Sequence, residues 1–363
     1  MKQMSNRERI VNTGLCKETD RAPFFFYFGP WAETMERWQR ECPGVTWDNW
    51  RQGYGFDEGI DALNVNLGYF PEFEYKLIED KGTTRIVQTS QGIIQEEMAH
   101  SSTIPRYLSS PVKNADDWEK LKKRLDPNDP ARFPPDWPKQ AETLNKADKA
   151  VQIGNYPWGL FGTLRDMMGV EDLLVNFYDQ PELIHNMMDY LTDFWLAIYE
   201  KAAKNVKIDI IHIWEDMSGC SGSLISPRMI RDFMMPNYKK IRKFADDHSI
   251  PLMSLDTDGD CTQLVPLFLE SGFNLLLPFE AAAGSDILDY RKKYPKLAIM
   301  GGIDKREIAL GKEHTDRELD RIKDMFKYPG YFPALDHLIH PEISHDDFEY
   351  FVAKLKEIIG ISV

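Results

Sequence analysis

The chain has 363 residues, of which 42% are hydrophobic and 28% charged, so its composition is that of a globular protein rather than a disordered or fibrous one. It is acidic, with 44 Lys and Arg against 58 Asp and Glu and a formal net charge of −14. Because binding to phosphates needs clustered Lys and Arg, this composition argues against nucleic acid and against an anionic membrane surface as partners.

The N-terminal part of the chain alternates between helical and strand-like patterns. Ser5 is a suitable helix N-cap, with Glu8 three residues after it. The run APFFFYF at 22–28 is continuously apolar, which is typical of a strand buried on both faces. The predicted elements, in order, are a helix over 5–14, a strand over 22–28, a helix over 31–41 and a strand over 61–66.

Residues 67–150 break this alternation. They contain strand pieces at 84–89 and 92–98, a helix at 116–125 and a Pro-rich passage at 127–138. Their hydrophobic content is too low for a core of their own. We therefore interpret 67–150 as an insertion that decorates a single domain over 1–363.

From residue 151 onward, short apolar runs alternate regularly with helical segments. Six strands are predicted there, at 151–154, 208–214, 251–255, 274–278, 297–300 and 331–335. With the two earlier strands they give eight βα units, the number that closes a parallel (β/α)8 (TIM) barrel. A doubly wound open sheet usually carries a Gly-rich phosphate loop after its first strand, and this chain has Gly29-Pro30-Trp31 there. We therefore predict an α/β fold with a single TIM barrel.

Cysteine usage and the N-terminus bear on the compartment. The four cysteines, Cys16, Cys42, Cys220 and Cys261, are scattered and form no Cys-x-x-Cys pair, which is typical of reduced thiols. The N-terminus is charged and lacks the apolar stretch of a signal peptide. No apolar run approaches the ~20 residues that span a bilayer. We expect a cytoplasmic protein.

Polar residues gather after the predicted strands, where barrel enzymes carry their catalytic groups. These residues are Asn66, Asn155, Glu215, Asp216, Asp256, Asp258, Asp260, Glu280, Asp304, Lys305, Asp336 and His337. So many carboxylates at one mouth would repel one another. Some must therefore be protonated, paired with Lys305, Arg306 or Arg165, or bound to a cation.

Four of these residues are the candidates for catalysis. Asp256 and Asp258 directly follow an apolar strand and suit general acid/base work or a hard metal, although a helix-capping turn through Asp260 is the alternative. Glu215 and His337 also end strands and are candidate acids, bases or ligands. His212 lies within a strand, where a hydrogen-bonded core histidine is the simpler interpretation.

Substrate binding is predicted for a second set, drawn from strand ends and from the abundant aromatic residues. Aromatic side chains suit a bulky or planar ligand, although core packing explains most of them. Lys305 suits a substrate carboxylate, or balances the acids. The predicted substrate-binding residues are Tyr27, Asn66, Asn155, Trp158 and Lys305.

Several segments together resemble the uroporphyrinogen decarboxylase superfamily. YPWGLFGTL (156–164) with Gly169 is similar to its G-x-P-F-T-L…G segment, and GGID (301–304) to its G-[GN]-[IV]-D turn. SPRMIRDFMMPNYKKI (226–241) also resembles the family, and LDH (335–337) falls at its L-G-H-G. The resemblance covers most of the chain, most clearly 150–350, and implies a (β/α)8 barrel with a deep polar cleft.

The sequence departs from the true decarboxylases of this superfamily. Their arginine-rich segment, which holds the porphyrinogen carboxylates, corresponds here to GPWAET (29–34), with no Arg before Arg37. Their catalytic Asp falls near Asn66, and an amide cannot stabilise developing positive charge as a carboxylate does. Both departures argue against tetrapyrrole decarboxylation.

The corrinoid-dependent methyltransferase relatives use zinc bound by H-x-C and a later Cys. Ser254-Leu255-Asp256 and Asp336 stand at those positions, so carboxylates replace both thiolates. A metal bound here should be harder, or more weakly held, than zinc at thiolates. The resemblance thus implies a divalent metal at Glu215, Asp256, Asp336 and His337.

The leading expectation is a methyltransferase-like enzyme that moves a methyl group between a corrinoid, free or on a partner protein, and a small methoxylated or methylated compound. Uroporphyrinogen decarboxylase, or another cofactor-free decarboxylase or lyase with Asp256 or His337 as proton donor, is the alternative. A non-enzymatic corrinoid- or ligand-binding barrel is the third. The resemblance also implies a homodimer.

Overall fold

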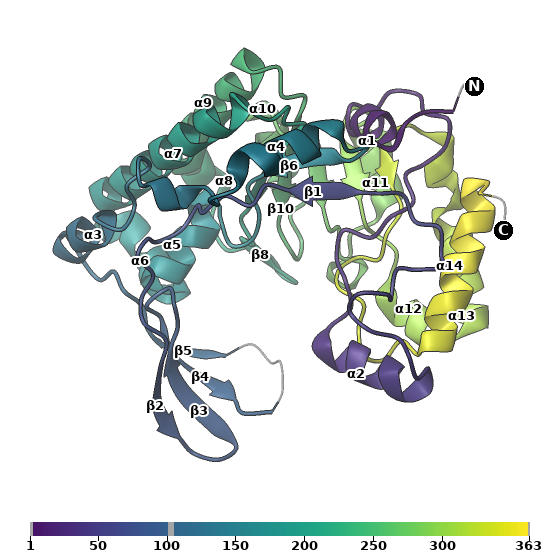
Figure 1. The fold of residues 1–363 in the computed structure, drawn as a ribbon, viewed down its shortest axis with the longest axis horizontal. Coiled ribbons are helices and arrows are strands. Elements are labelled where there is room, and N and C mark those ends of the chain that lie inside the picture. Colours follow the sequence, from purple (N-terminus) through teal and green to yellow (C-terminus); the bar gives the residue numbers. More distant parts are fainter. Residues whose placement is uncertain (1–2, 101–104, 362–363) are drawn as a thin grey trace.

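A seven-stranded parallel sheet forms the centre of the computed structural model, which describes residues 3–100 and 105–361. Its strands are β1 (Ile60–Ala62), β6 (Ala150–Ile153), β7 (Ile210–Trp214), β10 (Leu252–Asp256), β11 (Leu275–Leu277), β12 (Ala298–Met300) and β13 (Tyr331–Phe332). Their order in the sheet is their order in the chain, so the sheet is singly wound and curls in one direction (Figure 1). The six strands predicted after residue 150 are confirmed.

Helices surround the sheet; most of them pack in the outer core cluster, whereas Ile10 of the first helix belongs to the cluster of inward strand residues. The helices are α1 (Asn6–Gly14), α2 (Ala32–Glu41), α5 (Leu160–Met168), α6 (Val170–Asp179), α7 (Pro181–Ala203), α8 (Pro227–Met229), α9 (Met235–Asp247), α10 (Val265–Glu270), α11 (Ile287–Lys293), α12 (Lys305–Ala309), α13 (Lys312–Ile322) and α14 (His345–Ile359). Ser5 caps α1 in a full capping box with Glu8, as predicted. Within the described residues, no helix has the length and apolar character to cross a bilayer.

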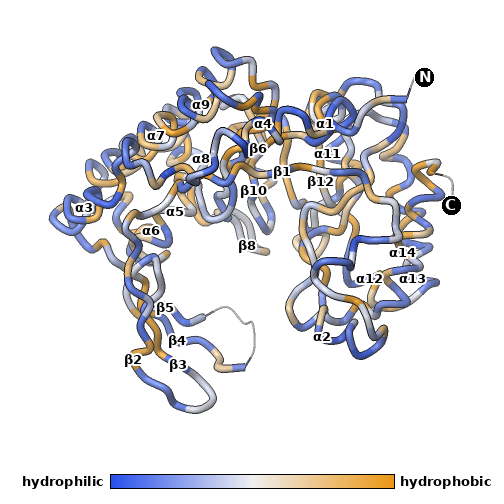
Figure 2. Tube along the Cα trace, in the orientation of Figure 1, coloured by the Kyte–Doolittle hydropathy of each residue, from blue (hydrophilic) through white to orange (hydrophobic). Residues whose placement is uncertain are grey.

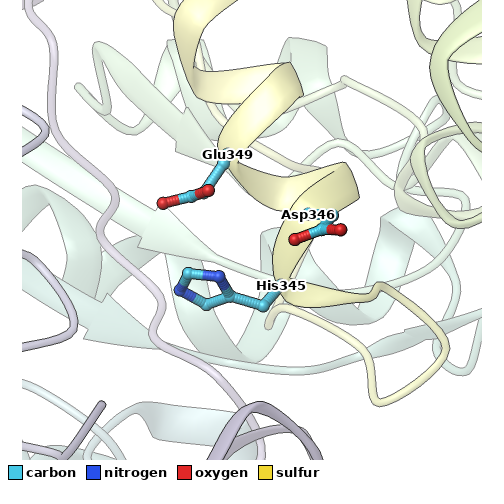
Figure 3. Close-up of side chains that lie close together, drawn as sticks. All are labelled: His345, Asp346 and Glu349. Carbon is cyan, nitrogen blue, oxygen red and sulfur yellow. The ribbon is translucent and has the colours of Figure 1, made fainter. Parts of the chain in front are cut away.

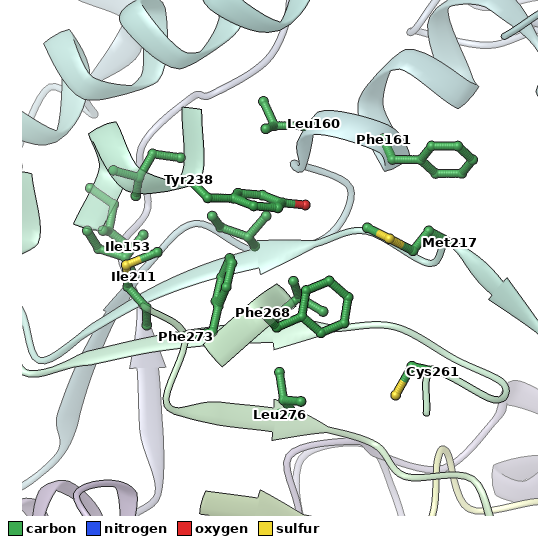
Figure 4. Packing of buried hydrophobic residues seen from close by; sticks show 14 of the residues in the cluster. Ile153, Leu160, Phe161, Ile211, Met217, Tyr238, Cys261, Phe268, Phe273 and Leu276 are labelled. Atoms are coloured by element: carbon green, nitrogen blue, oxygen red, sulfur yellow. The ribbon is translucent and has the colours of Figure 1, made fainter. Parts of the chain in front are cut away.

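The strands are apolar on both faces because each face packs in a different cluster. Outward residues such as Ile153, Ile211 and Leu276 pack against the helices (Figure 4). Inward residues such as Ile210 and Leu252 form a second cluster that also contains Phe25. Figure 2 shows hydrophobic and hydrophilic positions alternating along helices such as α7, the pattern of helices with one buried face.

The predicted first strand, 22–28, is wrong as a strand although right as a buried segment. Its Phe24 amide donates to the Asp57 carboxylate at 2.8 Å, and its Phe24 carbonyl accepts from the Asp57 amide at 2.7 Å. Pro23 has no backbone N–H group, so it cannot donate a hydrogen bond to a neighbouring strand. The sheet therefore shows seven strands rather than the eight expected, with Phe25 still packed against β13 through Phe332.

The segment predicted as an insertion carries a four-stranded antiparallel sheet, which extends away from the parallel sheet (Figure 1). Its elements are β2 (Lys76–Asp80), β3 (Thr84–Gln88), β4 (Ile94–Met98) and β5 (Arg106–Ser109), followed by α3 (Ala115–Lys122) and α4 (Trp137–Lys146). Every residue of β2 is exposed, Leu77 and Ile78 included, so this strand contributes no buried core. The predicted strand pieces at 84–89 and 92–98 are confirmed as β3 and β4.

At Gly159, just before α5, the backbone lies very close to the end of β7. A Cβ at Gly159 would lie 1.8 Å from the Trp214 carbonyl oxygen, whereas one at Gly219 would meet nothing within 4 Å. Because the obstacle at Gly159 is backbone, Gly159→Ala should lower the free energy of unfolding by about 3 kcal/mol or more. Gly219→Ala should change it by less than about 1 kcal/mol. Urea denaturation of both variants measures this, and similar losses would contradict the packing described.

Candidate functional site

A cavity of about 660 Å³ lies at the carboxyl ends of β7 and β10. Its polar lining comes from Asp216 after β7, Asp256 and Asp258 after β10, His337 after β13, and Arg165 and Asp166 on α5. The remaining lining is apolar or aromatic: Phe28, Pro105, Tyr107, Tyr156, Gly169, Val170, Trp214 and Leu338. The cavity therefore combines an acidic interior with aromatic and apolar walls.

Asp256, the last residue of β10, is the most deeply placed of these acids. It is 7% exposed, and it lines both this cavity and an adjoining one. Among the residues that the structure describes, the nearest cationic or imidazole group to its carboxylate is His212 Nε2, at 4.0 Å. Burial raises the pKa of Asp256 well above its usual range, and the carboxylates of Asp258, Asp216 and Glu280 add to the shift.

Asp258 faces His337 across the cavity, with 3.5 Å between Asp258 Oδ1 and His337 Nε2. That oxygen is buried, and no described residue forms a hydrogen bond with it. Burial, with help from Asp216 and Glu280, raises the pKa of Asp258 to about 7. Burial and then Lys305 lower the pKa of His337. Near neutral pH the pair therefore tends towards a protonated carboxyl beside a neutral imidazole.

Arg165 is the only Lys or Arg that lines this cavity in the described parts of the chain, and it is already paired. Its guanidinium lies 2.6 Å from Asp216 Oδ2 and sits over the Trp214 ring, 4.9 Å from the centroid. The neighbouring Asp166 has its pKa raised to about 6, chiefly by burial. The other three carboxyls of the cavity, Asp166, Asp256 and Asp258, therefore have no cation of the cavity lining to neutralise them, and they either stay negatively charged or bind protons.

The adjoining cavity, of about 550 Å³, shares Phe28, Tyr156 and Asp256 with the first. The predicted Tyr27 and Asn155 line it, together with Gln152 and His212. The amide of Gln152 donates to the Tyr27 hydroxyl at 2.9 Å. His212 Nδ1 lies 2.8 Å from Ser254 Oγ, and burial lowers the pKa of His212 to about 3, so this imidazole is neutral.

Glu215, predicted as catalytic and as a metal ligand, lines neither cavity. Its buried carboxylate accepts hydrogen bonds from the amides of Leu160, Phe161 and Gly162 and from the Tyr238 hydroxyl, at 2.6–3.2 Å. Burial raises the pKa of Glu215 to about 7 while these four bonds favour its charged form. In this structure Glu215 holds the N-terminus of α5 against the end of β7.

Asp336 and Lys305 also lie outside the cavities and are paired with each other. The Lys305 ammonium is 3.2 Å from Asp336 Oδ1, and the Ala281 amide donates to Asp336 Oδ2 at 3.0 Å. Lys305 also lies 3.7 Å from Glu280, which accepts from the Gly259 amide next to Asp258. This chain of contacts supports the loop that follows β10.

Asn66 and Trp158 likewise lie away from both cavities. The Asn66 side chain accepts from the Gly68 amide at 2.8 Å and from Arg132 at 3.2 Å, which makes it a turn residue. Trp158 packs against the large outer core cluster and over Gly68. Neither side chain is placed to contact a ligand in the cavities described.

The structure thus brings Asp256, Asp258 and His337 together in one cavity, and Tyr27 and Asn155 line the adjoining cavity. It does not bring together the four predicted metal ligands, because Glu215 is held by α5 and Asp336 by Lys305. Sequence reasoning missed Asp166 and Gln152. Asp166 lies within a helix rather than at a strand end, and its one signal was its closeness to the family-like segment at 156–164.

The raised pKa values predict how stability depends on pH. Between pH 3.8, the ordinary value for Asp, and about 7, the folded chain keeps a proton on Asp258 that the unfolded chain releases. Stability should therefore fall as pH rises through this window, and Asp258→Asn should reduce the fall. Chemical denaturation at pH 5 and pH 8 measures it, with Asp172→Asn on the exposed Lys113 pair as control. Equal pH dependence in wild type and Asp258→Asn would count against a raised pKa.

Comparisons with known proteins agree with this architecture. The chain is 22% identical over 240 residues to a uroporphyrinogen decarboxylase of Magnetococcus marinus, covering 60% of this chain and 61% of that protein. It is 24% identical over 188 residues to one of Hydrogenovibrio crunogenus, covering 50% of each. The chain therefore spans about half to three-fifths of the length of these curated relatives.

A solved methyltransferase from Methanosarcina mazei has a similar fold, with a TM-score of 0.54 over 98% of this chain and 99% of that one. The two are 14% identical, so this likeness concerns the fold alone. A family model described as uroporphyrinogen decarboxylase (URO-D) matches residues 95–358, most of the sequence including Asp256, Asp258 and His337. The chain belongs to the URO-D family.

Proposed function

We propose that this chain is an enzyme that transfers a methyl group from a small methoxylated or methylated compound to a corrinoid, with the acids of the cleft protonating the leaving atom. The observation that carries this proposal is the meeting of Asp256, Asp258 and His337 in one cavity of about 660 Å³. Carboxyl groups crowded in this way can hold protons at neutral pH, where isolated surface carboxyls cannot.

Asp258 is the residue best placed to act as general acid. With a pKa near 7, its carboxyl is protonated for a substantial fraction of the time at neutral pH and can still release that proton. His337, 3.5 Å away, is positioned to take part in returning the proton after each turnover. Asp256, buried beneath them, has a pKa raised well above its usual range, so its carboxyl stays protonated and can orient the substrate by donating a hydrogen bond.

For a methyl ether the step balances simply. The bond between the methyl carbon and oxygen breaks, its electron pair stays on the oxygen, and the Asp258 proton moves to that oxygen to give an alcohol. The corrinoid would supply the electron pair that forms the new bond to the methyl carbon. Asp258, left as a carboxylate, recovers a proton from solvent through His337. General acid assistance of this kind typically contributes 10²–10⁴-fold in rate.

The walls of the cavity suit a corrinoid that meets the substrate at the mouth. In this proposal the corrinoid presents its reacting face at the opening of the cavity, and the substrate occupies the interior. Tyr107, Val170 and Leu338 line the cavity, and Tyr107 and Val170 are exposed apolar surface. Such a rim suits a flat, largely apolar ring, whether free or presented by a partner protein. The homodimer implied by the family stays a prediction.

The metal expected from the resemblance does not fit the residues assigned to it. Both carboxylate oxygens of Glu215 already accept hydrogen bonds from the first amides of α5 and from the Tyr238 hydroxyl. Both carboxylate oxygens of Asp336 accept hydrogen bonds as well, from Lys305 and from the Ala281 amide. Only Asp256 and His337 of the four line the cavity. We therefore derive no step through a metal, and the chemistry proposed relies on proton transfer.

Tetrapyrrole decarboxylation finds less support in this site. Its substrate carries many carboxylates, which need cationic partners, whereas the cavity is lined by four Asp residues and by Arg165, already paired with Asp216. Neutral or cationic substrates suit this charge. A purely ligand-binding role would leave the unpaired buried oxygen of Asp258 without a purpose, since such groups destabilise a fold.

Asp258→Asn should lower methyl transfer by about 10²-fold or more, because the amide cannot donate a proton as an acid does. The assay uses a panel of methoxyphenols with chemically reduced cobalamin and follows the corrinoid spectrum and the released phenol. In wild type, kcat/KM should fall above pH 7 as Asp258 loses its proton, and Asp258→Asn should lack that limb. Asp172→Asn, on the surface, should behave as wild type. Full activity in Asp258→Asn would rule out this residue as the acid.

Substrate charge gives a second test of the site. Adding a carboxylate to the methoxylated ring should weaken kcat/KM by about tenfold or more, since the acids of the cavity repel it. Adding an amino group that is protonated at pH 7 should not weaken it. Steady-state kinetics on methoxybenzoate, methoxyphenol and methoxybenzylamine measure the order. A preference for the benzoate would show that the cavity does not present the negative surface described.

A further inference from the structure

Three potential metal ligands lie together on the first turns of α14, far along the chain from the cleft acids. They are His345, Asp346 and Glu349, and a ligand atom of each lies within 4.8 Å of the others. Figure 3 shows the His345 ring and the Glu349 carboxylate extending to the same side of the helix, with Asp346 beside them. The spacing places His345 and Glu349, four residues apart, on one helix face.

His345 is the buried member of this group and has spare hydrogen-bonding capacity. The residue is 7% exposed, and its ring meets Trp38 edge-on at 5.5 Å between centroids. Its backbone amide donates to Glu41 at 2.8 Å, but in the described parts of the chain no hydrogen bond is found to either ring nitrogen. The ring nitrogens are therefore free to bind an ion, and a neutral imidazole is a common ligand of transition metals.

The group borders a cavity of its own, of about 520 Å³. His345 and Glu349 line it together with Cys42, Tyr54 and Lys356, and it shares no lining residue with the two cleft cavities. An ion bound here would keep coordination positions open to the cavity.

We propose that His345, Asp346 and Glu349 bind a divalent first-row cation of the zinc type. One imidazole and two carboxylates are ligands that Zn²⁺ accepts, while an imidazole disfavours Mg²⁺ and Ca²⁺. The positive end of the α14 dipole and the Lys356 ammonium oppose a cation, and the carboxylates of Asp346, Asp347 and Glu349 offset them. The site is independent of the methyl transfer proposed above.

The test measures zinc bound to the full chain after treatment with a chelator. Equilibrium dialysis against buffered Zn²⁺, followed by elemental analysis, is run on wild type, Glu349→Gln and Asp346→Asn. Both substituted residues are exposed, so folding should be unaffected. We expect wild type to bind one more equivalent than either variant, or to bind it at least about tenfold more tightly. Excess Mg²⁺ should not displace this equivalent.

Two controls locate the ion. Glu342→Gln alters another surface His–Glu pair, with His340 Nδ1 3.5 Å from Glu342, and should bind zinc as wild type does. The double variant Asp256→Asn/Asp258→Asn removes cleft carboxylates and should also retain the equivalent. Equal zinc binding in wild type, Glu349→Gln and Asp346→Asn would overturn the proposal. So would loss of zinc in the cleft double variant alone, because the ion would then lie in the cleft.

Discussion

Carboxyl crowding at the end of β10 is the constraint on which the site depends. Asp256 and Asp258 are held beside Asp216 and Glu280, and the cations nearest to them, Arg165 and Lys305, are already paired. Charge of one sign in a partly buried site can be relieved by proton binding, which is what the raised pKa values express. A cluster that destabilises the fold when ionised is thereby suited to hold and release a proton near neutral pH.

The end of β7 shows how one strand end serves both the fold and the site. Glu215 turns towards the helix layer and binds the first amides of α5, while Asp216, with a positive φ of 43°, turns towards the cleft. α5 in turn carries Arg165 and Asp166 into the cavity. Loss of Glu215 would therefore affect the cleft indirectly, by releasing the helix that positions these two side chains.

The strands after residue 150 could be predicted because each is a short apolar run buried on both faces, and Asp256, Asp258 and His337 followed from their places after such runs. The direction of a strand-end side chain could not be predicted. Glu215 and Asp336 occupy the same kind of position, yet partners distant in the sequence, Tyr238 and Lys305, draw them away from the cavity. The segment at 22–28 failed as a strand for a similar reason, since Asp57 takes its hydrogen bonds.

The most direct test of the central claim is the titration of Asp258 itself. Carbon-13 NMR of protein labelled at the aspartate carboxyl carbons, followed from pH 4 to pH 9, separates carboxyls by the pH at which each loses its proton. The expected result is a resonance that titrates near pH 7 and disappears in Asp258→Asn. The contrary result is that the resonance lost in Asp258→Asn, and any other resonance that this substitution shifts, titrates below pH 5. The cleft would then hold no proton at neutral pH, which contradicts acid-assisted methyl transfer by this residue.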